Sequence, residues 1–317
     1  MAIDVAVGGR AILVDAGTYT YHESKALRDS FRSTEAHNTL TIDDESQSET
    51  SGKFNWKTKA KADLKQWISQ PRFDFFEGSH DGYERLSMPA MHTRGILFLK
   101  NDYWVMRDFV KTAGKHDYRL NFHFSSDVNP QIETAENGNS YVGETSDTES
   151  GVRLLTFGDN GDWRKKEGSV SNCYGRKNDS PFLQFASSGI GAQEFFTFLL
   201  PTEIGENAPQ VCETEISGGR AFVVNFRGCQ DLLVFTDGVQ IARTEIFNTN
   251  FRFLWARRGG GETLPKELVM IGGTHFTLDG REIINFSHEL EFATAWLFGN
   301  KLNVQTSKSV FSVLLSQ

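Results

Sequence analysis

The segment Tyr118-Arg-Leu-Asn-Phe-His-Phe-Ser125 alternates between apolar and polar side chains. In an extended chain, Leu120 and Phe122 point to one side, while Asn121 and His123 point to the other. This period of two predicts a β-strand with one buried face and one polar face. Strands of this kind are typical of antiparallel sandwiches.

Other segments on both sides of this strand also predict β-structure. Arg94–Leu99 and Tyr103–Phe109 flank Lys100-Asn101-Asp102, which predicts a hairpin with an Asn-Asp turn. Asp279-Gly280 predicts a second hairpin, and Asn137-Gly138 predicts another turn. No helix longer than about two turns is predicted. The expected fold is all-β, as a large two-layer antiparallel β-sandwich.

Length and composition favour a single large domain spanning residues 1–317. All-β sandwiches of roughly 200–250 residues commonly form one unit. Apolar residues make up 38% of the chain and include 26 Phe and 6 Trp, which is enough for a substantial core. We expect residues 206–317 to add strands that complete the sandwich formed by residues 1–205.

Charge and hydropathy narrow the classes of partner. The net charge of −8 argues against nucleic acid and against an anionic membrane surface. No apolar run approaches the roughly 18 residues of a membrane-spanning helix. Three scattered cysteines predict free thiols rather than a disulfide framework. Local clusters of arginine and lysine could still attract an acidic ligand.

Two polar residues stand where predicted strands meet loops. Asp15 follows the apolar run that ends at Val14, and His37 precedes the run that begins near Leu40. A carboxylate and an imidazole on neighbouring strand ends could form half of a metal site or an acid/base pair. Alternatively, Asp15 forms a turn and His37 is a hydrogen-bonded structural residue.

Several short motifs occur in a fixed order along the first two thirds of the chain. They are Gly8-Gly9-Arg10, Asp15-Ala16-Gly17-Thr18-Tyr19, Arg32-Ser-Thr-Glu-Ala-His37-Asn38-Thr39, His80-Asp81-Gly82-Tyr83, His92-Thr-Arg94, Asp102–Asp108, Tyr174-Gly175 and Phe196–Pro201. In this order, the motifs resemble the heparinase II/III-like family of polysaccharide lyases. The resemblance covers about residues 1–205.

This resemblance implies that the chain is the C-terminal β-sandwich portion of such a lyase. Family members carry a helical toroid domain and a His-rich run before this region. Their reaction is β-elimination at a uronic acid, in which a base removes a proton and an acid protonates the leaving oxygen. Because the helical domain supplies these groups, no catalytic residue is predicted within residues 1–317. The chain alone is therefore expected to be inactive.

The resemblance also implies site residues and partners. Asp15 and His37 would be metal ligands for zinc, with the third ligand expected upstream of Met1, or from His80 if it lies within the chain. The expected partners are an acidic polysaccharide or oligosaccharide, together with the helical toroid domain or a second copy of the chain. A periplasmic or secreted location is favoured over the cytoplasm. The residues predicted to contact substrate are Arg32, Asn38, His80, Tyr83 and Tyr174.

Each predicted substrate contact has an alternative interpretation as a hydrogen-bonding residue within the sandwich. Two alternatives also remain for the function of the whole chain. The first is a non-catalytic carbohydrate-binding or scaffold module that pairs with a separate helical domain. The second is an unrelated metal-dependent hydrolase that uses Asp15 and His37. An exposed aromatic patch is expected near Tyr19, Tyr21 and Tyr174.

Overall fold

The computed structural model describes residues 1–134, 140–144, 150–203 and 207–315. The chain divides into two compact units, Met1–Ile204 and Gly205–Gln317, where the sequence predicted one domain. Each unit has its own hydrophobic core. The described strands after residue 206 pair with one another in a ten-stranded sheet. Alternation within a strand does not reveal which sheet that strand joins, so this division could not be read from the pattern.

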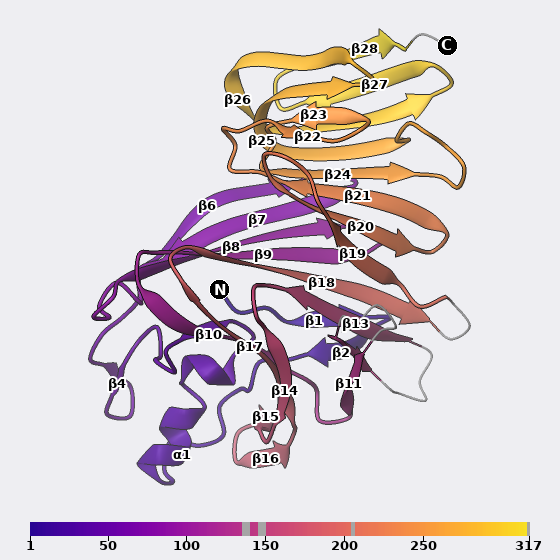
Figure 1. The fold of residues 1–317 in the computed structure, drawn as a ribbon. Coiled ribbons are helices and arrows are strands. Elements are labelled where there is room, and N and C mark those ends of the chain that lie inside the picture. Colours follow the sequence, from indigo (N-terminus) through magenta and orange to yellow (C-terminus); the bar gives the residue numbers. More distant parts are fainter. Residues whose placement is uncertain (135–139, 145–149, 204–206, 316–317) are drawn as a thin grey trace. The chain divides into compact units, whose positions relative to one another are not determined.

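The first unit is built on two antiparallel sheets (Figure 1). In order across the larger sheet, the strands are β11 (Pro130–Thr134), β12 (Ser140–Glu144), β13 (Ser150–Phe157), β18 (Gln193–Glu203), β9 (Trp104–Thr112), β8 (Ala90–Leu99), β7 (Phe73–His80) and β6 (Ala62–Ser69). The strands of the smaller sheet are β14 (Asp162–Lys166), β17 (Phe182–Ile190), β10 (Lys115–His123) and β3 (Leu40–Ile42).

A shared core joins these two sheets. Leu120 and Phe122 of β10 belong to the same buried cluster as Met106 and Val110 of β9. Each of these four side chains is at most 1% exposed. Apolar faces packed in this way stabilise a sandwich because both sheets remove hydrophobic surface from water. The predicted all-β antiparallel sandwich is confirmed.

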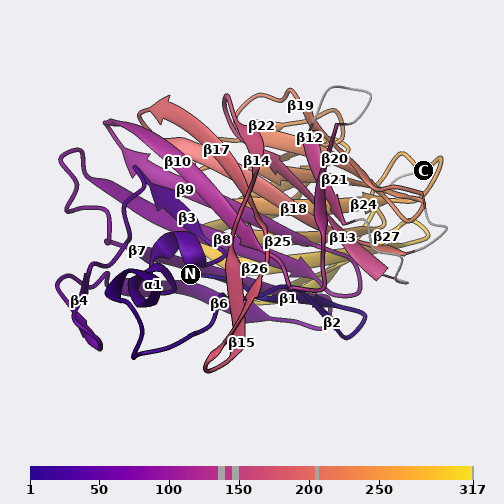
Figure 2. The same cartoon turned by 90° about the horizontal axis from the view of Figure 1, so that it is seen from below.

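Short elements complete the first unit. The helix α1 (Lys25–Ser30) and the hairpin of β4 (Thr50–Ser51) and β5 (Asn55–Trp56) lie close together outside the large sheets in both views (Figures 1 and 2). The side chain of Ser24 caps α1 by accepting a hydrogen bond from the backbone N–H of Leu27. The remaining elements are β1 (Val5–Val7), β2 (Arg10–Leu13), the 3₁₀ turn η1 (Thr34–Ala36), β15 (Ser169–Cys173) and β16 (Arg176–Asp179).

The predicted alternation of β10 is present, but its polar face is not exposed to solvent. Asn121 and His123 are only 1% and 4% exposed. His123 Nε2 lies 2.7 Å from the Glu35 carbonyl oxygen, and Asn121 Nδ2 donates to the Thr39 carbonyl oxygen. The segment that contains η1 therefore covers this face. Its backbone carbonyls contact the polar side chains of this face, which is therefore buried as well.

Both predicted hairpins are confirmed. β8 and β9 pair antiparallel, and Asn101 between them has a positive φ of 68°. Asp279 and Gly280 have φ values of 49° and 72°. Two consecutive positive φ angles are characteristic of the tight turn that matches the twist of paired strands. The turn predicted at Asn137-Gly138 lies outside the described residues.

The second unit has its own core, which includes Val234, Leu254, Met270 and Ala293. Among the described residues, no helix is long and apolar enough to cross a membrane. The strands of the second unit are β19 (Gln210–Thr214), β20 (Arg220–Phe226), β21 (Cys229–Phe235), β22 (Ala242–Arg243), β23 (Phe247–Thr249), β24 (Phe253–Arg258), β25 (Glu267–Leu278), β26 (Arg281–Phe298), β27 (Lys301–Thr306) and β28 (Val310–Leu314).

The cysteines agree with the prediction of free thiols. Cys173 belongs to the first unit, while Cys212 and Cys229 belong to the second, and none of the three forms a disulfide bond. Cys173 and Cys212 are exposed. Neither core is therefore stabilised by a disulfide bond between these cysteines.

Candidate functional site

Asp15 and His37 lie side by side, as the sequence analysis predicted. Asp15 comes just after β2, and His37 ends the turn η1. His37 Nδ1 lies 2.5 Å from Asp15 Oδ2. The other carboxylate oxygen of Asp15 accepts a hydrogen bond of 2.8 Å from the Gly17 N–H. The carboxylate is therefore held on both sides before any ligand binds.

Gly17 is required by the local geometry. Its φ is +73°, and a Cβ atom built at this position would lie 2.3 Å from the Ser171 carbonyl oxygen. Any side chain at this position would force the two segments apart. The Asp-x-Gly motif therefore places a carboxylate at the end of β2 while the chain passes close to β15.

The pair is partly open to solvent. The side chains of His37 and Asp15 are 29% and 43% exposed. Burial acts to raise the pKa of Asp15, but hydrogen bonds from His37 and Gly17 outweigh it and hold the pKa below its ordinary value. Asp15 is therefore a carboxylate at neutral pH and can attract a cation or orient the imidazole.

Asn38 joins the backbone segments around this pair. Its Nδ2 donates to the Val14 carbonyl oxygen at 3.0 Å and to the Ile3 carbonyl oxygen at 2.8 Å. Its Oδ1 accepts a hydrogen bond of 2.6 Å from the His123 N–H. Asn38 is 1% exposed. The structure thus supports a positioning role for Asn38 and does not support the predicted direct contact with substrate.

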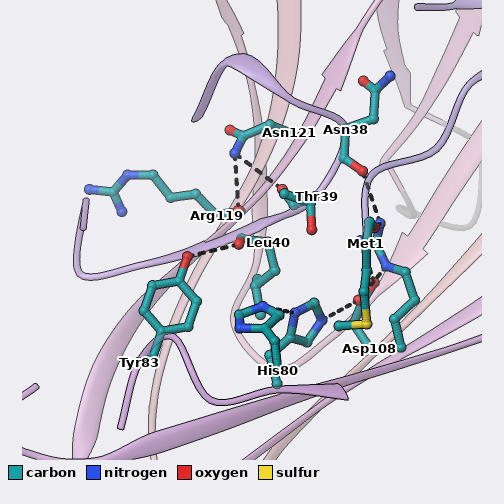
Figure 3. Close-up of polar contacts among 11 residues, drawn as sticks. Met1, Asn38, Thr39, Leu40, His80, Tyr83, Asp108, Arg119 and Asn121 are labelled. Atoms are coloured by element: carbon teal, nitrogen blue, oxygen red, sulfur yellow. Dashed lines mark hydrogen bonds and ion pairs between the residues drawn. The ribbon is translucent and has the colours of Figure 1, made fainter. Parts of the chain in front are cut away.

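A buried ionic network contacts the backbone of Asn38 (Figure 3). Arg94 is paired with Asp108 across β8 and β9, with Nε 2.7 Å from Oδ1. Arg94 Nη1 donates to the Asn38 carbonyl oxygen at 2.9 Å. His92 Nε2 lies 2.6 Å from Asp108 Oδ1, and His92 Nδ1 lies 3.2 Å from His80 Nε2. The network therefore connects three neighbouring strands to the segment that carries His37.

Electrostatics explains why this network can remain buried. Burial acts to raise the pKa of Asp108, but the Arg94 guanidinium and His92 outweigh it and lower the pKa to about 2. For His80, burial lowers the pKa to about 3, and the neighbouring positive charges act in the same direction. The stable state at neutral pH is an Arg–Asp ion pair next to a neutral His80.

These shifts predict a loss of stability in acid. His80 titrates near 6.5 when unfolded but near 3 when folded, so the unfolded state binds the proton first. Its contribution is complete above pH 6.5 and is lost as the pH falls toward 3. The lowered pKa of Asp108 adds a further loss between its ordinary 3.8 and about 2. We expect the denaturation midpoint of the first unit to fall steadily below pH 6.5.

The variant His80→Asn is the control for this pH dependence. In this variant, the denaturation midpoint should depend less on pH between pH 6.5 and 4. The loss of stability at lower pH, which is caused by Asp108, should remain. Burial also lowers the pKa of His92 and of His123, so the variant removes only part of the slope. Equal slopes for the variant and the wild type in chemical denaturation at each pH would contradict the assignment to His80.

Two other predicted contact residues are also internal. His80 is 3% exposed, and its Nδ1 accepts a hydrogen bond from the Gly82 N–H. Tyr83 has no exposed surface, and its hydroxyl donates to the Leu40 carbonyl oxygen at 3.1 Å. Direct contact with a polysaccharide is therefore not supported for either residue. With both ring nitrogens engaged within the protein, His80 is also not supported as a third metal ligand.

The last two predicted contact residues lie at the surface. Tyr174 is 54% exposed, and its hydroxyl accepts a hydrogen bond of 3.2 Å from the Tyr21 N–H. Arg32 donates to the carbonyl oxygens of Gly52 and Asn55. Tyr174 is thus accessible to a ligand, whereas Arg32 holds a neighbouring hairpin.

The ionic roles of His92, Arg94 and Asp108 were not predicted from the sequence. The signal was the presence of three ionisable residues within hairpin strands whose other positions are largely apolar. Such residues are seldom fully buried unless they are paired. That pattern could have predicted a paired internal network, although not its connection to Asn38.

Comparison with known families agrees with the fold and with the order of the motifs. The C-terminal domain of the heparinase II/III-like family matches residues 1–188. The chain belongs to this family. A heparin-sulfate lyase of Pedobacter heparinus is 24% identical over 217 residues, which cover 67% of this chain and 30% of that protein.

Solved structures show the same fold. Heparan sulfate lyase HepC from Pedobacter heparinus has a TM-score of 0.61 and 21% identity, covering 74% of this chain and 36% of its own. A crystal structure of heparinase III has a TM-score of 0.57 and 16% identity, with coverages of 74% and 35%. The heparinase II/III-like chain thus spans about a third of the length of these relatives.

Proposed function

We propose that this chain is the β-sandwich portion of a polysaccharide lyase that performs β-elimination on glycans containing uronic acid. The observation that carries the proposal is the Asp15–His37 pair, which lies within the family-matched region and is partly open to solvent. Relatives named as lyases of heparin sulfate or heparan sulfate support an acidic polysaccharide as the substrate class.

The donor set of the pair fits zinc. A carboxylate oxygen and an imidazole nitrogen are both common zinc ligands. Asp15 Oδ2 and His37 Nδ1 share a hydrogen bond of 2.5 Å, and zinc held by both atoms would replace the proton between them. In the described part of the chain, no group of three or more His, Cys, Asp or Glu side chains could hold a metal ion. Zinc held by Asp15 and His37 would therefore need a further ligand that is not one of the described His, Cys, Asp or Glu side chains. When bound, the ion would act as a Lewis acid.

The chain's own residues would orient the site rather than transfer protons. Asp15 fixes the imidazole of His37 through Nδ1. Asn38 fixes the backbone on both sides of the pair through Val14 and His123. We propose that the base and the acid of the elimination lie outside residues 1–317, so this chain supplies one wall of the active site.

Zinc binding tests the role of the pair. Isothermal calorimetry should show weak binding by the wild type because only two ligands are supplied. Loss of a group that merely supports a metal ligand typically costs about 10–100-fold in affinity, so His37→Ala should cost at least about tenfold. His22→Ala is the matched control because His22 is an exposed histidine in the same part of the chain.

The two variants separate a site-specific effect from a general one. Equal zinc affinity for His37→Ala and the wild type would overturn the metal role. An equal loss in His22→Ala would show non-specific binding to surface histidines. Activity is a separate readout: formation of unsaturated uronate from heparan sulfate by the 317-residue chain would place the base and acid within it, contrary to the proposal.

A further inference from the structure

Three aromatic rings form a cluster on the surface of the first unit. The ring of Tyr21 lies 5.0 Å from that of Phe54 and 5.6 Å from that of Tyr174, measured between centroids. Phe54 is 69% exposed and Tyr174 is 54% exposed. Large aromatic side chains at such exposure leave apolar surface in water, and contiguous patches of this kind mark binding sites.

A pocket of about 220 Å³ opens beside this cluster. Its volume is below the roughly 300–1,000 Å³ of sites for drug-sized ligands, which suits a single sugar ring. Thr18 and Tyr19, three and four residues after Asp15, also line it, so the chain segment that follows Asp15 reaches this pocket. The residues that define its character are Tyr21, Arg32, Lys53, Phe54 and Trp56.

Arg32 gives this surface a defined shape. Its Nη1 donates to the Gly52 carbonyl oxygen at 3.0 Å, and its Nη2 donates to the Asn55 carbonyl oxygen at 3.1 Å. Its guanidinium also stacks over the Trp56 ring at 4.3 Å. The hairpin tip that carries Phe54 is therefore held from both sides. A preorganised tip avoids part of the ordering cost of binding.

Lys53 supplies the charge. It is exposed next to Phe54, and no ion pair to it occurs among the described residues. The Tyr174 pKa is lowered first by hydrogen bonds from Thr20 and from the Tyr21 N–H, and then by the positive charge of Lys53. Lys53 also lines the pocket together with Tyr21 and Phe54, so its ammonium is available to an anionic ligand bound there.

We propose that this aromatic pocket is a subsite for one ring of an anionic polysaccharide. The apolar face of the sugar packs on Phe54 and Tyr21, and its anionic group pairs with Lys53. Tyr174, which is 54% exposed and lies beside Tyr21, adds a further aromatic surface for the sugar. The inference rests on the proposed function, which supplies the substrate class, and it adds residues that hold the polymer in the same unit as the Asp15–His37 pair.

Calorimetry with a heparan sulfate tetrasaccharide tests the subsite in the 317-residue chain. Loss of an aromatic contact of about 0.5–1.5 kcal/mol corresponds to roughly twofold to tenfold in affinity. Phe54→Ala should therefore weaken binding by about that factor, and Lys53→Gln should weaken it most at low salt. Because Phe54 and Lys53 are exposed, both variants should keep the wild-type melting temperature.

Matched controls are Phe298→Ala, which removes a phenylalanine that is 81% exposed, and Lys115→Gln, which removes an exposed lysine. Neither should change binding. Wild-type affinity in Phe54→Ala and Lys53→Gln would overturn the subsite and leave the proposed function standing. Absence of tetrasaccharide binding by the wild type would overturn both. Equal affinity for a neutral tetrasaccharide would overturn the charge role of Lys53.

Discussion

Replacing Arg94 with methionine is expected to destabilise the first unit by about 3–5 kcal/mol, the usual cost of removing one partner of a buried ion pair. Asp108 has no exposed surface and would lose the guanidinium that neutralises it. The Asn38 carbonyl oxygen would also lose its donor. Hydrogen exchange of the β8 and β9 amides in increasing denaturant measures the effect on this unit alone.

Arg107→Met is the matched control because it removes an arginine from β9, one strand from Arg94. Its ion pair with Glu194 is partly exposed, and such pairs contribute roughly 0–1 kcal/mol. We expect a much smaller loss there. Equal losses in the two variants would show that burial of the Arg94–Asp108 pair is not what determines its effect.

Replacing Asn38 with alanine is expected to destabilise the first unit by at least as much as Arg94→Met. It removes three hydrogen bonds and leaves the His123 N–H and two carbonyl oxygens without this partner. Each buried polar group left unsatisfied costs about 1–3 kcal/mol. Asn38 directly follows His37 and donates to Val14, which directly precedes Asp15. We therefore expect the hydrogen bond between His37 and Asp15 to weaken in this variant.

Proton NMR of the His37 imidazole separates these two effects. A short hydrogen bond to Asp15 should give a resolved N–H resonance in the wild type, and Asn38→Ala should broaden or remove it at a temperature where the protein stays folded. The variant Asn38→Asp keeps the acceptor for His123 and should retain more of the signal. A lower stability with an unchanged His37 resonance would reduce Asn38 to a structural residue.

The fold could be read from the sequence wherever a pattern is local. The alternation in 118–125 and the tight turn at Asp279-Gly280 each depend on a few consecutive residues, and both predictions are confirmed. The division of the chain at residue 204 depends on which strands pair, which alternation does not encode. The buried polar face of β10 was missed because the covering segment lies about 85 residues earlier in the chain.

The candidate site was predictable in part for the same reason. The convergence of Asp15 and His37 follows from two motifs, and the structure places them in contact. Polar character alone could not separate a ligand contact from an internal hydrogen bond, so Asn38 and Tyr83 were assigned to the substrate. The place of Phe54 in the aromatic cluster could not be read from the sequence, since Tyr21 comes from a distant segment.

Locating the bound acidic glycan on the chain tests the proposed function and the subsite most directly. Amide NMR of the isotope-labelled 317-residue chain, titrated with a heparan sulfate tetrasaccharide, reports the position of the ligand residue by residue. We expect the chemical-shift changes to concentrate in residues 15–21, 32–37 and 52–56 and around Tyr174. Shifts confined to residues 207–315, or none at concentrations that saturate a weak site, would contradict this expectation.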